Sequence, residues 1–200
     1  TSGLKGILLT KDQEVVGVAE SNYSVQNRRT GWSEQDPSDW IYACENVMLS
    51  LSNQFPSQIL ELKGIGISGQ MHGAVLLDKN GNVIRPCMLW NDTRSYAQAQ
   101  KMDEGDLFRG ISGNIVFPGF TAPKVSWVEE NEPENFKKIA SILLPKDYLR
   151  FWLTGDLVSE MSDAAGTSWL DLEKRCWSET LLEASNLNVQ QMPTLIEGSE

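Results

Sequence analysis

A short stretch around the only histidine of the chain brings together side chains that can bind a small polar ligand. His72 directly follows Met71, a few residues after an apolar run at residues 64–68. A second apolar run ends at Trp90, with Asp92 two residues later. An imidazole exchanges hydrogen bonds with a polyol, and an indole stacks on the apolar face of a sugar. Polar and aromatic groups at two strand ends are typical of a small-molecule pocket in an α/β protein.

Each of these residues also has an ordinary structural interpretation. A lone histidine more often satisfies a backbone partner than a ligand, and Met71 would more often pack in a core. Trp90 is one of seven tryptophans, so core packing is its default role. Asp92 could form a local ion pair with Arg94. The residues alone leave both interpretations open.

The first five residues could face an anion. Thr1, Ser2 and Gly3 form a small-residue turn that exposes backbone N–H groups and hydroxyls, and Lys5 adds a cation nearby. An exposed N-terminal turn without a ligand is the more ordinary explanation of the same residues.

The other polar residues do not form a recognisable catalytic or metal site. Asp147 and Asp163 lie near expected helix starts, where capping is the usual role of an aspartate. The sequence contains no serine–histidine–aspartate arrangement, no convincing general base and no set of metal ligands. We therefore predict no catalytic residue and no metal ligand within residues 1–200.

Composition and charge restrict the class of protein. The net charge of −10 argues against nucleic acid or an anionic membrane as the main partner. No apolar run approaches the ~20 residues of a membrane-spanning helix, and the start does not resemble a signal peptide. Cys44, Cys87 and Cys176 are odd in number and far apart, which favours free thiols in a reducing cytoplasm.

Hydrophobic periodicity predicts the elements that would position these residues. Residues 1–10 and 14–21 form a predicted hairpin, followed by a helix that begins near Asp36 or Ser38. Further strands are predicted at residues 64–68, 74–78, 83–84, 87–90 and 141–144. Helices are predicted at residues 94–102, 124–130, 132–140 and 180–184, with a segment at 148–153 that ends at Gly155. This order predicts an α/β protein with a mixed β-sheet flanked by helices.

Taken in order along the chain, the motifs resemble the N-terminal domain of the FGGY family of carbohydrate kinases, and most closely its xylulokinase members. Residues 1–5 resemble the end of the family's first phosphate motif, and residues 69–73 resemble a sugar-contact motif. Glycerol kinases resemble Arg-Glu where this chain has Met71-His72. The remaining matches lie at residues 31–37, 90–94, 119–127, 144–149 and 162–167.

The resemblance implies an actin-like ATPase, ribonuclease-H-like fold. It also implies that the intact enzyme uses ATP with Mg²⁺ to phosphorylate D-xylulose to D-xylulose 5-phosphate. The implied sugar-site residues are Met71, His72, Trp90 and Asp92. The residues implied to face the ATP phosphates are Thr1, Ser2, Gly3 and Lys5.

The resemblance also sets what to expect of the rest of the enzyme. The family carries an acidic residue three positions before Thr1, which helps to place Mg²⁺. Its catalytic aspartate and its ATP-binding half would lie beyond Glu200. We therefore expect residues 1–200 to be most of the N-terminal, sugar-binding domain, inactive alone, of a cytoplasmic enzyme for which a homodimer is one option.

Three alternatives remain open from the sequence. One is an FGGY kinase for another ketose or polyol, such as ribulose, gluconate or fuculose, although Met71-His72 argues against it. Another is a non-catalytic member that senses sugar. An actin- or chaperone-like module would share the fold but would not explain the sugar motifs.

Overall fold

The computed structural model describes residues 2–198, in which short strands and helices alternate along the chain. The strands are β1 (Gly3–Leu9), β2 (Val15–Asn22), β3 (Glu34–Gln35), β4 (Val75–Leu77), β5 (Cys87–Met88), β6 (Ser141–Leu143), β7 (Val158–Glu160), β8 (Leu170–Asp171), β9 (Cys176–Trp177) and β10 (Thr194–Ile196). The helices are α1 (Pro37–Gln54), α2 (Pro56–Leu60), α3 (Tyr96–Asp103), α4 (Leu107–Ser112), α5 (Thr121–Asn131), α6 (Pro133–Phe136), α7 (Pro145–Thr154), α8 (Met161–Ala164) and α9 (Glu179–Glu183). Two 3₁₀ turns, η1 (Ala165–Thr167) and η2 (Val189–Gln191), complete the elements.

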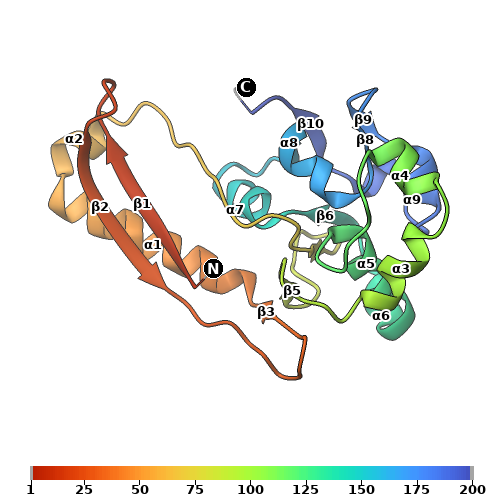
Figure 1. Ribbon diagram of the computed structural model, residues 1–200. Coiled ribbons are helices and arrows are strands. Elements are labelled where there is room, and N and C mark those ends of the chain that lie inside the picture. The colour runs from red at the N-terminus through yellow and green to blue at the C-terminus, as the bar shows by residue number, and fades with distance from the viewer. Residues whose placement is uncertain (1, 199–200) are drawn as a thin grey trace.

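The predicted N-terminal hairpin is confirmed and stands at one side of the molecule (Figure 1). Strands β1 and β2 pair antiparallel, and α1 lies along one face of the pair. Leu8 of β1, Ala19 of β2 and Val47 of α1 belong to one small buried cluster between them. Gly6 permits this close approach, because a Cβ at that position would collide with the Val47 side chain.

Helix α1 begins where the sequence predicts and for the predicted reason. Of the two predicted caps, Asp36 is the N-cap, and its carboxylate accepts a hydrogen bond from the Ser38 N–H at 2.9 Å. Pro37 occupies the first helical turn, where a missing N–H costs nothing.

The remaining strands pair in short ladders. Strand β3 pairs with β5 and β4 with β6, both antiparallel, and a single bridge between Ala74 and Met88 connects the two ladders. Strand β7 pairs in parallel with β10, and β8 pairs antiparallel with β9. The mixed α/β class is therefore confirmed, with its strand pairing divided among two-stranded units in residues 2–198.

The prediction of a buried strand at residues 64–68 is wrong. This segment is an extended connection, and its Ile65 side chain is 56% exposed. Among the described residues no backbone hydrogen bond joins it to another strand. It lies across a groove of about 410 Å³ from β1 instead of beside a partner. The sequence supplied β-forming side chains, but a strand also needs a neighbour for its backbone groups.

Other differences concern boundaries. Helix α6 ends at Phe136, earlier than the predicted residue 140, and β10 forms in a tail for which no element is predicted. Helix α7 covers the predicted segment at 148–153 and ends at Gly155, whose φ of +81° is the left-handed conformation that glycine adopts readily.

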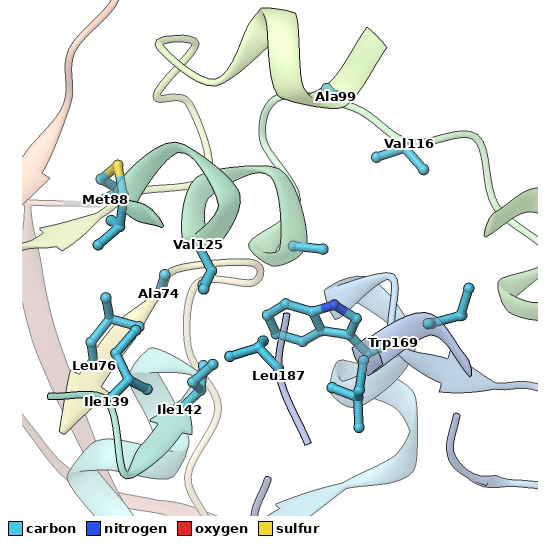
Figure 2. Close-up of a cluster of buried hydrophobic side chains, with 14 of the residues drawn as sticks. Ala74, Leu76, Met88, Ala99, Val116, Val125, Ile139, Ile142, Trp169 and Leu187 are labelled. Carbon is cyan, nitrogen blue, oxygen red and sulfur yellow. The ribbon is translucent and has the colours of Figure 1, made fainter. Parts of the chain in front are cut away.

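The main core lies in the larger part of the molecule, around Trp169. This indole is fully buried, and Figure 2 shows it facing Leu187 and the side chains of Val125 and Ile142. Its Nε1 donates a hydrogen bond to Ser185 Oγ at 2.9 Å, so the one polar atom of the side chain is satisfied. Within residues 2–198, no helix has the length and apolar character needed to cross a membrane.

We predict that Trp169→Ala lowers the free energy of unfolding by about 3–5 kcal/mol, because it leaves a cavity in the main core. Urea unfolding followed by circular dichroism measures the change. Leu60→Ala is the control, since Leu60 is 88% exposed on α2, and it should change stability by less than about 0.5 kcal/mol. Equal effects of the two substitutions would contradict the assignment of the core.

Candidate functional site

One cavity brings together residues of both predicted binding motifs. It has a volume of about 580 Å³, and its lining includes Met71 and Trp90 as well as Gly3 and Lys5. The other lining residues come from β1, the loop after β2, α1, the extended segment and the start of α7: Leu4, Tyr23, Trp40, Ile67, Ser68, Gly69, Gln70, Pro145, Lys146 and Leu149. A cavity of this size accommodates a small polar ligand.

Met71 and Trp90 give the cavity its apolar surfaces. Their side chains are 45% and 47% exposed, so both are available to a ligand. A half-exposed indole can stack on the C–H face of a sugar, and a thioether adapts to an irregular surface. Core packing, the ordinary alternative for these two residues, is therefore not what the structure shows.

His72 directly follows the cavity residue Met71 but does not itself line the cavity. The side chain is half-buried, and its ring packs against Phe120 with 4.5 Å between ring centroids. Its Nδ1 lies 2.8 Å from the carbonyl oxygen of Gly166, and a carbonyl only accepts. Burial lowers the pKa of His72, the hydrogen bond to Gly166 acts in the opposite direction, and the charge of Lys124 lowers it further. The imidazole is therefore neutral at pH 7.

Lys124 also contacts the sugar motif, a role that the sequence did not predict. It is fully buried on α5, and its Nζ donates hydrogen bonds to the carbonyl oxygens of His72, at 2.8 Å, and Gly119. Burial lowers the pKa of Lys124 to about 7. Helical spacing is the one signal for its burial, because Thr121 and Val128, three positions before it and four after it on α5, are also buried.

Asp92 occupies a position that does not fit the predicted contact with substrate. It is fully buried and does not line the cavity. Its carboxylate accepts hydrogen bonds from the Arg94 guanidinium, at 2.6 Å from Nη2, and from the Ser33 N–H at 2.7 Å. The Arg94 guanidinium lies 3.6 Å from the centre of the Trp32 ring and also pairs with Glu34. Asp92 therefore balances the charge of the buried Arg94. The ion pair between the two residues, the ordinary alternative considered for Asp92, is present and is buried.

The predicted phosphate residues are only partly brought together. Thr1 lies outside the described residues, and Ser2 is exposed and does not line the cavity. Gly3 and Lys5 line it, but Lys5 Nζ also pairs with Glu20 at 3.0 Å, and both side chains are more than half exposed. The cavity thus has one mobile cation, already shared with a carboxylate, at this wall.

A second charged group at the cavity is Lys146, which the sequence analysis did not assign. Its Nζ lies 2.6 Å from Asp147 and 3.2 Å from Asp163. Burial lowers the pKa of Lys146, but the neighbouring carboxylates outweigh it and the net shift is upward. The predicted capping roles of these aspartates are wrong: α7 has no side-chain cap, and Glu160 caps α8. Both carboxylates instead neutralise the lysine.

No cluster of three or more metal-ligating side chains is present in residues 2–198. Glu20 is paired with the cavity-lining Lys5, and Asp147 and Asp163 are paired with the cavity-lining Lys146. The described residues by themselves therefore do not fit a bound divalent cation.

Three comparisons relate the chain to known proteins. The family model described as FGGY family of carbohydrate kinases, N-terminal domain, matches residues 1–200. The chain is 48% identical over 201 residues to a xylulose kinase of Escherichia coli strain K12 and 47% identical over 201 residues to one of Klebsiella pneumoniae. Each match covers 100% of this chain and 41% of the relative.

Among solved structures, a protein from Brucella ovis named as a xyloylose kinase is 54% identical, with a TM-score of 0.98. The match covers 100% of this chain and 41% of that one. The chain therefore spans about 41% of the length of these relatives. The solved structures of this group have an actin-like fold, which confirms the predicted fold class.

We predict that Asp92→Asn destabilises the chain by about 3 kcal/mol, because it leaves the buried Arg94 without its closest opposite charge. Urea unfolding measures the loss. Glu134→Gln is the control: Glu134 pairs with Lys137 on the surface, with side-chain exposures of 78% and 68%, and such pairs contribute little. A change at Asp92 no larger than the control would mean that the carboxylate has no structural role.

We predict a second effect on stability that depends on pH. Between about pH 7 and pH 10.5 the folded chain holds Lys124 neutral while the unfolded chain holds it protonated. Stability should therefore rise with pH across this window, by up to about 1.4 kcal/mol per pH unit, and the contribution is lost as pH falls toward 7. Lys124→Met should lack that rise.

The measurement is the free energy of unfolding in urea at about pH 7.5 and about pH 9.5. Lys137→Met, which removes an exposed lysine, is the matched control and should keep the rise of the unmodified chain. An identical pH dependence in Lys124→Met and the unmodified chain would contradict the lowered pKa.

Proposed function

Because the chain belongs to the FGGY family of carbohydrate kinases, we propose that it forms most of the sugar-binding N-terminal domain of a kinase that phosphorylates D-xylulose. The intact protein would transfer the γ-phosphoryl group of ATP to a terminal hydroxyl, giving D-xylulose 5-phosphate. The substrate class rests on the relatives, which are named as xylulose kinases and match the whole chain. The ATP-binding half would belong to the part of the protein outside these residues, because the relatives are more than twice as long.

The observation that carries the proposal is the shared cavity. Met71 and Trp90, from the sugar motif and the strand end after it, line the same space as Gly3 and Lys5 from the phosphate motif. A phosphoryl transfer requires the acceptor hydroxyl and the phosphate chain to meet in one place. The arrangement supports a site at which both substrates are held together.

Residues of the sugar motif, of the strand end after it and of the phosphate motif have proposed parts in binding. Trp90 and Met71 would contact the C–H face of the sugar, and His72 would exchange a hydrogen bond with one of its hydroxyls. Gly3 would let the backbone approach the phosphates, and Lys5 would exchange its surface partner Glu20 for phosphate oxygens. Ser2 would add a hydroxyl at the start of β1, and Thr1, which lies outside the described residues, keeps the phosphate-facing role implied by the motif.

Among residues 2–198 we assign no side chain as the proton acceptor of the reaction. The carboxylates of Asp147 and Asp163 are both paired with Lys146, which lines the cavity. We place the general base, and the residues that would hold Mg²⁺ with ATP, outside residues 1–200. The isolated chain should then bind sugar at most and release no ADP.

The cellular setting follows from the substrates. ATP and reduced thiols occur together in the cytoplasm, and the three cysteines of this chain are free, with Cys44 and Cys87 buried. We propose a cytoplasmic enzyme on this basis.

The test is an ADP-release assay on the full-length protein with D-xylulose, ribulose, gluconate and glycerol. D-Xylulose should give the highest kcat/KM. His72→Ala should lower that value by about 5- to 150-fold, corresponding to the ~1–3 kcal/mol cost of an unpaired hydrogen-bonding group. The measurement is kcat/KM of the two proteins on D-xylulose.

Tyr42→Phe is the control, because Tyr42 is 67% exposed on α1 and away from the cavity. It should leave kcat/KM unchanged. Absence of ADP release with D-xylulose would overturn the proposed function, and an unaffected His72→Ala protein would overturn the role of the histidine.

A further inference from the structure

Gly166 and His72 are in close contact although 94 residues separate them. The Gly166 carbonyl oxygen lies 2.8 Å from His72 Nδ1. A Cβ at Gly166 would lie 2.5 Å from both Nδ1 and Cε1 of the imidazole, closer than real Cβ atoms approach other atoms. Gly166 does not have a positive φ, so its backbone conformation is open to any residue. The position therefore needs glycine for the space that the imidazole fills.

The backbone of His72 is fixed from the opposite side. Its φ is +64°, a left-handed conformation that is unfavourable for a residue other than glycine. Its carbonyl oxygen accepts hydrogen bonds from Lys124 Nζ at 2.8 Å and from Thr121 Oγ1 at 3.2 Å. Both donors belong to α5, whose apolar face packs in the main core. Since the backbone is held by the core, the ring direction is set by its contacts with Phe120 and Gly166.

The contact with Gly166 also decides which ring nitrogen carries the proton. A carbonyl oxygen can only accept, so a neutral imidazole must hold its proton on Nδ1 to make this hydrogen bond. The other nitrogen, Nε2, then carries a lone pair and can only accept. The ring thus offers a ligand an acceptor at a fixed place and direction.

We propose that Gly166 is a positioning residue that holds His72 as the Nδ1–H tautomer, so that Nε2 selects a substrate hydroxyl able to donate a hydrogen bond. The part that concerns substrate rests on the proposed function, in which His72 contacts the sugar. The tautomer and the position of the ring are properties of this chain alone. A sugar in which that hydroxyl is replaced by hydrogen or a methyl ether cannot donate and is discriminated against.

The first experiment is nitrogen-15 NMR of the 200-residue chain labelled at histidine. His72 is the only histidine, so the spectrum contains one imidazole and needs no assignment. The unmodified chain should show the Nδ1–H tautomer with Nε2 unprotonated. Gly166→Ala should displace the ring and lose that tautomer in favour of Nε2–H, the form that free histidine prefers.

Gly110→Ala is the matched control. Gly110 lies in α4, and a Cβ there meets nothing within 4 Å, so the imidazole signals should not move. An unmodified chain with Nε2–H, or a Gly166→Ala chain that keeps Nδ1–H unchanged, would overturn the proposal. The measurement on the unmodified chain requires no substitution, so the proposal can fail even if Gly166→Ala does not fold.

The second experiment uses the full-length protein. Gly166→Ala should lower kcat/KM for D-xylulose by about 10- to 100-fold through misplacement of the ring, with most of the change in KM, while Gly110→Ala has no effect. Unchanged kinetics together with a changed tautomer would remove the substrate role of the positioned ring. Full-length protein without activity on D-xylulose would instead overturn the proposed function, and the tautomer result would stand separately.

Discussion

A buried amino group holds the candidate site to the core of this protein. Lys124 projects from α5, whose other buried side chains pack in the main core, and its Nζ binds the carbonyl oxygens of His72 and Gly119. The first carbonyl belongs to the sugar motif, and the second lies next to the helix start. Burying a lysine without a carboxylate partner is costly, which is why its pKa falls to about 7.

A separate network holds the other wall of the cavity. Asp92 and Arg94 lie two and four residues after Trp90, and their ion pair is fully buried. Trp32 covers the guanidinium on one side, and Glu34 adds a second carboxylate. In contrast to Lys124, this cation is compensated by opposite charge. The segment after Trp90 is therefore fixed by paired charges, while the backbone of His72 is fixed by hydrogen bonds that its carbonyl oxygen accepts from Lys124 and Thr121.

Elements that depend on residues close together in the sequence were predicted correctly. The hairpin of β1 and β2 and the start of α1 at Asp36 follow from alternation and from a cap with a following proline, and both are confirmed. Residues 64–68 have the composition of a strand, but pairing depends on what lies beside them, which local composition does not contain. Asp92 was grouped with the cavity because it follows Trp90. Its side chain turns into the interior because two groups bind it there: Arg94, two residues later, and Ser33, 59 residues earlier in the chain.

The roles of Gly166 and Lys124 were beyond prediction for the same reason, since each acts on His72 from a distant part of the chain. Both features reduce stability when considered alone: a buried lysine pays desolvation, and a histidine at φ +64° is strained. A leucine at 124 and a glycine at 72 would relieve both. The two costs converge on one residue, His72, which directly follows Met71 in the lining of the cavity of about 580 Å³. Strain that is concentrated on one residue and over-determined by its surroundings is the pattern of a binding residue held ready in advance. This convergence fits the role proposed for His72 better than a packing role would.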